Sequence, residues 1–294
     1  MRVWFADLRN SGTLSLIASV APESWGCTKL YIFDKTPTGF ELYSFYLADA
    51  PVGHDLANSV LDLGNNGKQE LVLWGSLAGF ATSSGLRYGL GCEAEWPLIF
   101  SWTGNSYSDV SDQYKNYYRG YLKSVNARLA AYSSVLAPEA AQTASPVSPR
   151  WGIGGSGPQA DAVIPSDANE EGAVSGPVRV TPAATPAWAA RNQAHRNYPC
   201  TRIEAAKTEA FLGVHSDSAM STAIKDSESD DPKKRITAAV VFSFLGTDEA
   251  EQDLKRLSND ADPRVAALAK SAPSFRGDPP RDALTMSRKK PISN

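Results

Sequence analysis

Short apolar runs separated by turn-forming residues fill roughly the first 110 residues of the chain. The runs at 30–33, 71–73 and 98–102 are rich in aliphatic and aromatic residues, and glycine, asparagine, aspartate and proline break the pattern between them. Runs of this composition are typical of strands in hairpins and antiparallel sheets. We therefore predict an all-β region at the N-terminal end of the chain.

A polar turn occurs twice within this region. Asp62 and Gly67 stand in a turn that runs directly into an apolar strand, and Asp7 and Gly12 stand in the same places 55 residues earlier. Each turn is followed by a strand, a long variable connection and a further strand that ends near an aromatic residue. This spacing predicts two copies of one unit, each a four-stranded sheet with a long insertion.

The turn resembles the FG-GAP or VCBS repeat, whose usual form is Asp-x-Asp-x-Asp-Gly-x-x-Asp/Glu ahead of a strand of a β-propeller blade. The resemblance implies an incomplete β-propeller-like region, because two blades cannot close a propeller, which typically has about four to eight. Met1 stands only six residues before Asp7. We therefore expect further blades, and any export signal, to be encoded upstream.

The same resemblance implies a calcium loop in the second copy. Asp62, Asn66 and Glu70 stand at its first, fifth and ninth places, and Gly67 provides the bend at the sixth. A low carboxylate count weakens the binding of a doubly charged ion, and only two of these ligands are acidic. Two alternatives follow: a degenerate calcium site at Asp62, Asn66 and Glu70, or a turn held by side chain to backbone hydrogen bonds, which we favour. The first copy retains only Asp7 and is expected to bind no calcium.

Helical spacing replaces the β pattern at 111–134. Apolar side chains recur there at i, i+4, i+7 and i+11, namely Tyr118, Leu122, Val125 and Leu129. Ser111 and Asp112 are candidate N-caps. The interleaved tyrosines and basic residues would also suit a base-stacking surface. We expect instead that the helix packs its tyrosines on the neighbouring sheet while its basic residues stay solvated.

Residues 135–197 are rich in alanine, proline, serine and glycine and carry no sustained apolar period. Such a stretch cannot bury enough apolar surface to offset chain entropy, so we predict a disordered linker. Residues 152–157 match the dinucleotide-binding pattern Gly-x-Gly-x-x-Gly, but that mechanism requires a strand before the glycines and a helix after them. Prolines flank the stretch instead. We therefore predict no nucleotide site there.

A helical pattern returns in residues 198–272 and repeats itself. Asp-Pro pairs at Asp231 and Asp262 are sound helix starts, because aspartate caps the helix and proline presets its first turn. Leu-Gly pairs at Gly213 and Gly246 mark the matching stops. We predict helices at 203–212, 217–226, 232–245, 248–258 and 263–271.

This unit resembles a HEAT-like repeat of the short type related to phycobilisome lyases, with its Asp-Pro-x-x-Arg start and Leu-Gly turn. The resemblance implies a small α-solenoid whose helix faces bind a partner. The polar, basic tail at 273–294 is predicted to be disordered. The predicted fold class is multidomain β and α, with an incomplete β-propeller-like region at 1–134, a disordered linker at 135–197 and an α-solenoid at 198–272.

Composition limits the partners. A formal net charge of −3 gives no argument for nucleic acid, and the chain contains no run of about 18 apolar residues that would span a membrane. Cys27 and Cys92 each precede an apolar strand, in matching places of the two units. They either pair in an oxidising compartment or are two buried thiols, which we favour, and Cys200 is left over in both cases.

Catalytic chemistry finds no support in the sequence. His54, His195 and His215 lie in different regions, and none has a Cys, Asp or Glu partner at zinc-ligand spacing. No nucleophile elbow or phosphate loop is present. The acidic run at 226–231 is expected to be a solvated interhelical loop. We therefore predict that the protein is not an enzyme and carries no cofactor apart from the calcium alternative.

These features together predict a non-catalytic interaction or scaffold protein whose partner is another protein. The resemblance to envelope-associated VCBS and HEAT chains implies a periplasmic or extracellular location. The alternatives are an accessory subunit of an enzyme, similar to lyase-associated HEAT proteins, and a calcium-stabilised adhesive module. The sequence defines neither the partner nor the oligomeric state.

Overall fold

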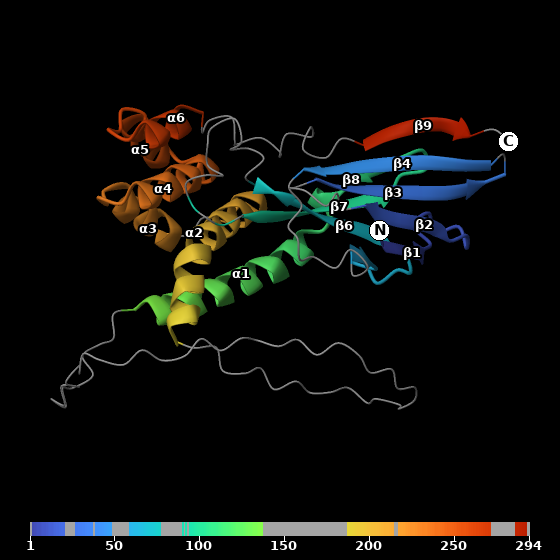
Figure 1. The fold of residues 1–294 in the computed structure, drawn as a ribbon, viewed down its shortest axis with the longest axis horizontal. Coiled ribbons are helices and arrows are strands. Elements are labelled where there is room, and N and C mark those ends of the chain that lie inside the picture. The colour runs from blue at the N-terminus through green and yellow to red at the C-terminus, as the bar shows by residue number, and fades with distance from the viewer. Residues whose placement is uncertain are drawn as a thin grey trace, which may run out of the picture.

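The computed structural model describes residues 2–20, 27–37, 39–48, 59–77, 90, 92, 94–137, 187–214, 217–271 and 286–292. Within these ranges, strands form two antiparallel sheets at one end of the molecule and α-helices gather at the other end (Figure 1). The expectations for the 152–157 motif, His54 and His215 fall outside the described residues.

The strands form two successive four-stranded meanders. Sheet A contains β1, β2, β3 and β4 in chain order, with β9 added beside β4, and sheet B contains β5, β6, β7 and β8 in chain order. The strand bounds are β1 (Arg2–Ala6), β2 (Ser15–Val20), β3 (Cys27–Thr36), β4 (Gly39–Ala48), β5 (Val60–Leu61), β6 (Glu70–Ser76), β7 (Glu95–Trp102), β8 (Tyr107–Asp109) and β9 (Met286–Ile292). The predicted pair of four-stranded units is confirmed. The described strands do not close into a propeller.

The first polar turn joins β1 to β2 and is organised by Asp7. Its carboxylate accepts hydrogen bonds from the backbone N–H groups of Ser11 at 3.0 Å and Gly12 at 2.7 Å. Asn10 and Gly12 have positive φ angles of 51° and 75°. Asparagine and glycine tolerate this left-handed conformation better than other residues, which explains their positions in the turn.

The second polar turn joins β5 to β6 with the same geometry. Asp62 accepts hydrogen bonds from the N–H groups of Asn66 at 3.0 Å and Gly67 at 2.9 Å, and the φ angles of Asn65 and Gly67 are 50° and 79°. The repeat seen in the sequence is therefore a repeat of backbone structure.

Buried and half-buried side chains alternate along the central strand of sheet A. In β3, Leu30, Ile32 and Asp34 are 0%, 0% and 1% exposed, whereas Tyr31 and Phe33 between them are half-buried. We call the buried side of sheet A its inner face and the opposite side its outer face. The alternation follows from the strand period of two.

The inner face of sheet A packs on sheet B through aromatic side chains. The ring of Phe45 lies 5.1 Å from that of Phe100, and the ring of Tyr43 lies 5.8 Å from that of Trp102 and 5.2 Å from that of Tyr107. These rings meet edge to face, the arrangement that aromatic quadrupoles favour. The two repeats therefore stack face to face and share a core.

The helix predicted at 111–134 is confirmed. A short 3₁₀ turn (Ser111–Gln113) leads into α1 (Lys115–Leu136). The hydroxyl of Tyr118 donates to the carbonyl of Pro97 at 2.6 Å, and that of Tyr121 donates to the carbonyl of Glu95 at 3.1 Å. The tyrosines thus pack on β7, as expected.

The N-cap predicted for this helix is wrong. Tyr114 occupies the N-cap position and makes no side-chain capping bond. The hydroxyl of Ser111 accepts a hydrogen bond from the N–H of Ile99 instead. Pairing with the neighbouring strand has taken the side chain that would have capped an isolated helix.

The C-terminal helices are α2 (Ala187–Leu212), α3 (Asp217–Ser227), α4 (Pro232–Leu245), α5 (Asp248–Leu257) and α6 (Pro263–Ser271). The last four agree with the predicted ranges to within one residue at each end. Asp231 accepts the N–H of Lys233 at 2.9 Å, and Gly246 ends α4 with a φ of 63°. The cap signals read from the sequence are therefore confirmed here.

Helix α2 begins earlier than predicted. It starts at Ala187, and α1 ends only at Leu136, so the linker prediction is wrong for 135–136 and for 187–197. Residues 138–186 lie outside the described residues. The first part of α2 lacks an apolar stripe, although this helix packs on α1. Ala194 is only 1% exposed, and a small buried side chain of this kind gives little apolar signal in the sequence. The tail prediction is also wrong for 286–292, because β9 pairs with β4. A strand can join the edge of a sheet through backbone hydrogen bonds alone, so β9 needs no alternating apolar pattern in its sequence.

Helix α2 also joins the two ends of the molecule. A disulfide links Cys200 on α2 to Cys92, which precedes β7. The sequence expectation for Cys92 and Cys200 is therefore wrong, because they pair with each other where α2 meets the start of β7. The side chain of Cys27 lies outside the described part of the structure. One continuous apolar core runs from sheet A to α6. The sheets and helices are thus in direct contact rather than tethered only by a linker.

Candidate functional site

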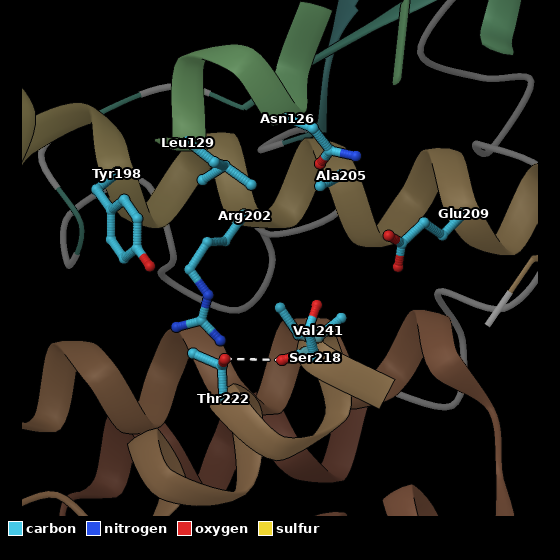
Figure 2. A pocket seen from close by; sticks show the side chains of 10 residues that line it. Asn126, Leu129, Tyr198, Arg202, Ala205, Glu209, Ser218, Thr222 and Val241 are labelled. Atoms are coloured by element: carbon cyan, nitrogen blue, oxygen red, sulfur yellow. Dashed lines mark hydrogen bonds between the residues drawn. The ribbon is translucent and has the colours of Figure 1, made fainter. Parts of the chain in front are cut away.

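A groove lies between α1, α2, α3 and α4 (Figure 2). It encloses about 510 Å³, including the part that opens to solvent. Asn126 and Leu129 of α1 lie above it, and α3 and α4 form its floor. The side chains that line it are Asn126, Leu129, Tyr198, Arg202, Ala205, Glu209, Ser218, Ala219, Thr222 and Val241.

One stripe of α2 forms the main wall of the groove. Tyr198, Arg202, Ala205 and Glu209 stand at i, i+4, i+7 and i+11, so helical periodicity places them on one face. Figure 2 shows Tyr198, Arg202 and Glu209 extending from α2 into the space above α3. A helix face that packs between other helices ordinarily carries apolar residues, yet two of these four residues are charged.

Arg202 is held at one end of the groove by Asp226 at the end of α3. The two side chains form an ion pair through Nη1 of the arginine, and Arg202 is only 8% exposed. Its Nη2 atom is buried and has no hydrogen-bond partner. The guanidinium lies 6.0 Å from the ring centre of Tyr198. A positively charged donor is therefore fixed in place with part of its hydrogen-bonding capacity unused.

Glu209 lies two helical turns further along α2. It is 6% exposed, and its Oε2 atom is buried without a hydrogen-bond partner. Burial raises the pKa of this carboxyl group. Leaving a buried acceptor unpaired costs free energy, so its persistence requires an explanation. Glu209 lines the groove, so a donor bound there would satisfy this atom once the side chain rotates toward it.

Apolar side chains separate the two charged ends. Ala205 of α2, Leu129 of α1 and Val241 of α4 line the middle of the groove. On its floor, the hydroxyl of Thr222 donates to the carbonyl of Ser218 at 2.7 Å, so this hydroxyl is already engaged within α3. Because an α-helix rises 1.5 Å per residue, Arg202 and Glu209 stand about 10.5 Å apart along α2.

A second buried glutamate on α2 shows what a satisfied site looks like. One carboxylate oxygen of Glu204 accepts the N–H of Glu95 at 3.1 Å, and the other accepts Nη2 of Arg128 at 2.6 Å. Burial raises the pKa of Glu204, although Arg128 acts in the opposite direction. Glu204 fastens α2 to α1 and β7. Glu209, on the groove side of the same helix, has no such partners for Oε2.

A buried polar cluster between the sheets is the other concentration of charge. Asp34 on β3 accepts hydrogen bonds from Arg9 at 2.7 Å, from the hydroxyl of Tyr107 at 3.0 Å, and from the hydroxyl of Ser15. Arg9 also donates to Glu41 at 2.7 Å. Its guanidinium lies 3.9 Å from the centre of a Trp102 ring, within cation–π distance.

Electrostatics of this cluster follow from its burial. Burial by itself would lower the pKa of Arg9, but hydrogen bonds to Glu41 and Asp34 raise it in total. Burial and the charge of Asp34 both raise the pKa of the Tyr107 hydroxyl. The cluster spans both sheets with its hydrogen bonds made, so it fixes how the sheets dock and offers nothing to a ligand.

The predicted calcium ligands lie in the second turn. Both oxygens of Asp62 accept backbone N–H groups, and Oδ1 of Asn66 accepts the N–H of Lys68 at 2.9 Å. Glu70 is fully buried and accepts the N–H of Leu63 at 3.0 Å. These bonds belong to the favoured alternative of a turn held by its own side chains. Calcium binding at Asp62, Asn66 and Glu70 stays a prediction.

The described residues add little to the other chemistry considered. His195 is exposed on α2, and no group of three or more His, Cys, Asp and Glu side chains is arranged to hold a metal in the part of the chain that the structure describes. Among the described helices, none is both long enough and apolar enough to cross a bilayer.

Sequence reasoning missed Arg202 and Glu209. The available signal was two charged residues within one stripe of a helix that also contains Tyr198 and Ala205. That signal required knowing that α2 is covered on this side by α1 and α3.

Comparison with known proteins returned no relatives: no protein-family model, curated protein or solved structure matches the chain.

Proposed function

We propose that the protein is a non-catalytic interaction protein, and that the groove along α2 binds an extended segment of a partner protein. The observation that carries this proposal is the pair of buried, unpartnered atoms at its two ends, Nη2 of Arg202 and Oε2 of Glu209. One is a donor and the other is an acceptor. A ligand must therefore offer an acceptor at one end and a donor at the other.

Charge decides what should stand at each end. Arg202 is already paired with Asp226, so a neutral carbonyl suits it better than a second carboxylate. Glu209 has no cation beside its free oxygen, so an ammonium or guanidinium group suits it best. A polypeptide supplies both, through a backbone carbonyl and a lysine or arginine side chain.

Length and surface agree with this ligand. A strand advances about 3.3 Å per residue, so about three extended residues span the 10.5 Å or so between the charged positions. The middle of the groove is lined by Ala205, Leu129 and Val241, which suit small apolar side chains.

The disulfide bears on the cellular compartment in which the protein would bind its partner. A disulfide such as Cys92–Cys200 forms and persists in oxidising compartments. This supports the proposal that the protein belongs to the cell envelope or the extracellular space. The groove is then positioned by a cross-linked helix, which limits the entropy lost when a ligand binds.

The test uses the full chain and a defined probe, N-acetyl-Ala-Ala-Lys-amide. Isothermal titration should detect binding, and replacing the lysine by norleucine should weaken it at least tenfold, because the ammonium is lost while the apolar stem remains. Glu209→Gln should weaken binding of the lysine probe to a similar degree. The matched control Glu249→Gln, at an exposed position of α5, should leave binding unchanged.

Folding of the Glu209 variant can be checked independently. Glu209→Gln removes a buried charge that lacks a full set of partners, so the variant should be at least as stable as the wild type in urea. Equal affinity of the wild type for the lysine and norleucine probes would contradict the proposal. So would unchanged affinity in a folded Glu209→Gln variant.

A further inference from the structure

Large apolar side chains are exposed on the outer face of sheet A. Val3, Phe5 and Phe40 are 46%, 61% and 54% exposed, although large apolar side chains of this kind are ordinarily buried. Val20 adds a fourth exposed side chain at 38%. The same face carries the half-buried side chains Leu16, Tyr31, Phe33 and Leu42. Contiguous apolar patches on a protein surface commonly mark an interaction site.

The corresponding face of sheet B is buried. Leu16 pairs with Phe33 in sheet A as Leu71 pairs with Phe100 in sheet B, so strand register identifies equivalent positions. Leu71 and Phe100 are 0% and 7% exposed, against half-buried Leu16 and Phe33. Phe100 contacts Phe45, so what covers this face in sheet B is the inner face of sheet A.

We propose that the outer face of sheet A is a docking surface for a second antiparallel sheet, supplied by a partner protein. The interface between sheets A and B, within the same molecule, shows how such a face is covered. The inner face of sheet A combines an apolar centre, which includes Phe45, with carboxylates at one side, Asp34 and Glu41. A partner sheet whose face has this composition would be complementary to the outer face of sheet A.

Charge further defines the partner. Lys29 and Lys35 lie on the outer face, and none of the described side chains of that face is acidic. Lys35 pairs with Phe40 as Trp102 pairs with Tyr107, so Lys35 occupies the place of Trp102. In the A–B interface that place lies against the guanidinium of Arg9, which Asp34 and Glu41 hold. A cation at the same place of a partner would repel Lys35, whereas a carboxylate would attract it. The partner sheet should therefore carry a carboxylate opposite Lys35.

A second copy of this chain is a poorer occupant. Its own inner face is already covered by its sheet B. The opposite face of sheet B is buried as well, with Val72 and Ile99 at 2% and 0% exposure. Two outer faces docked on each other would bring lysines together without acidic side chains, and like charges at an interface are unfavourable.

Photo-crosslinking in cells of the source organism tests the proposal. The full chain carries p-benzoylphenylalanine in place of Phe5, and the control carries it in place of Val214, which is exposed at the end of α2. The expected crosslink at position 5 joins this chain to a different protein. The crosslinked residue of that protein should lie in an antiparallel β-strand next to an Asp or Glu. No adduct above the control, or an adduct with a second copy of this chain, would overturn the proposal.

Charge reversal provides the second arm. With the crosslinked partner purified, Lys35→Glu should reduce its affinity for the full chain at least tenfold, because a cation facing a carboxylate becomes an anion. Lys123→Glu, on an exposed part of α1, should have no effect. Unchanged binding by Lys35→Glu would refute the predicted carboxylate.

Discussion

Two regions of the molecule bury charged side chains and use them differently. Between the sheets, Asp34 accepts hydrogen bonds from Arg9, Tyr107 and Ser15. In the helical groove, Arg202 and Glu209 each keep one buried atom without a partner. A closed cluster fixes how structural elements dock, whereas an open pair of charges is suited to a ligand. Of these two regions, the groove is therefore the one that we propose binds a ligand.

The largest expected effect comes from opening the closed cluster. Asp34→Ala leaves Arg9 and the hydroxyl of Tyr107 without their main acceptor, and breaking a buried pair in this way costs about 3–5 kcal/mol of unfolding free energy. Urea denaturation measures it. The matched control is Ser101→Ala, at the equivalent position of sheet B, where the hydroxyl has no partner to lose. A loss as small as that of the control would show that the cluster does not hold the sheets together.

The disulfide should come next, because it connects the sheet end to the groove helix. Cys92→Ser or Cys200→Ser removes a cross-link between two residues that are 108 positions apart in the sequence. Removing a native disulfide typically costs about 2–5 kcal/mol, and a long loop lies toward the upper end of that range. Thermal unfolding with and without a reducing agent measures it: reductant should lower the stability of the wild type toward that of the variants and leave the variants unchanged. A wild type that is insensitive to reductant would argue against the bond.

Smaller effects should distinguish the two turns from ordinary glycine positions. Gly12 has a φ of +75° and Gly67 a φ of +79°, and a Cβ added at either position meets no other atom. Backbone strain is therefore the only expected cost of Gly12→Ala and Gly67→Ala. Each should lose about 1–2 kcal/mol in urea denaturation. Gly120→Ala, inside α1 with nothing near its added Cβ, should instead gain about 0.5–1 kcal/mol. Unequal losses at the two turns would show that the repeats are not energetically equivalent.

Local signals explain how much of this structure the sequence could predict. The caps at Asp231 and Gly246 and the turns at Asp7 and Asp62 depend on residues close together in the chain, and their elements were placed correctly. The start of α2, the Cys92–Cys200 pair and β9 depend on contacts between distant segments. The groove required four helices to be positioned together, so Arg202 and Glu209 were not identifiable as a site.

The pH dependence of stability sharpens the contrast between the two regions. Because burial raises the pKa of Glu209 above its ordinary value of 4.5, the folded protein holds this proton more tightly than the unfolded chain does. Its ionised form therefore reduces stability, and the reduction grows as pH rises from about 4.5 through the raised pKa. The stability of Glu209→Gln relative to the wild type should increase over that interval and then level off in urea denaturation.

Measuring the pKa of Glu209 is also the most direct test of the claim that the groove binds a cationic group of a partner. Carboxyl carbon NMR of protein labelled at glutamate, with Glu209→Gln to assign the signal, measures it with and without saturating N-acetyl-Ala-Ala-Lys-amide. We predict a pKa above the ordinary value in the free protein and a fall when the peptide binds, because the lysine stabilises the carboxylate. An ordinary pKa in the free protein, or a raised pKa that the saturating peptide leaves unchanged, would contradict the account.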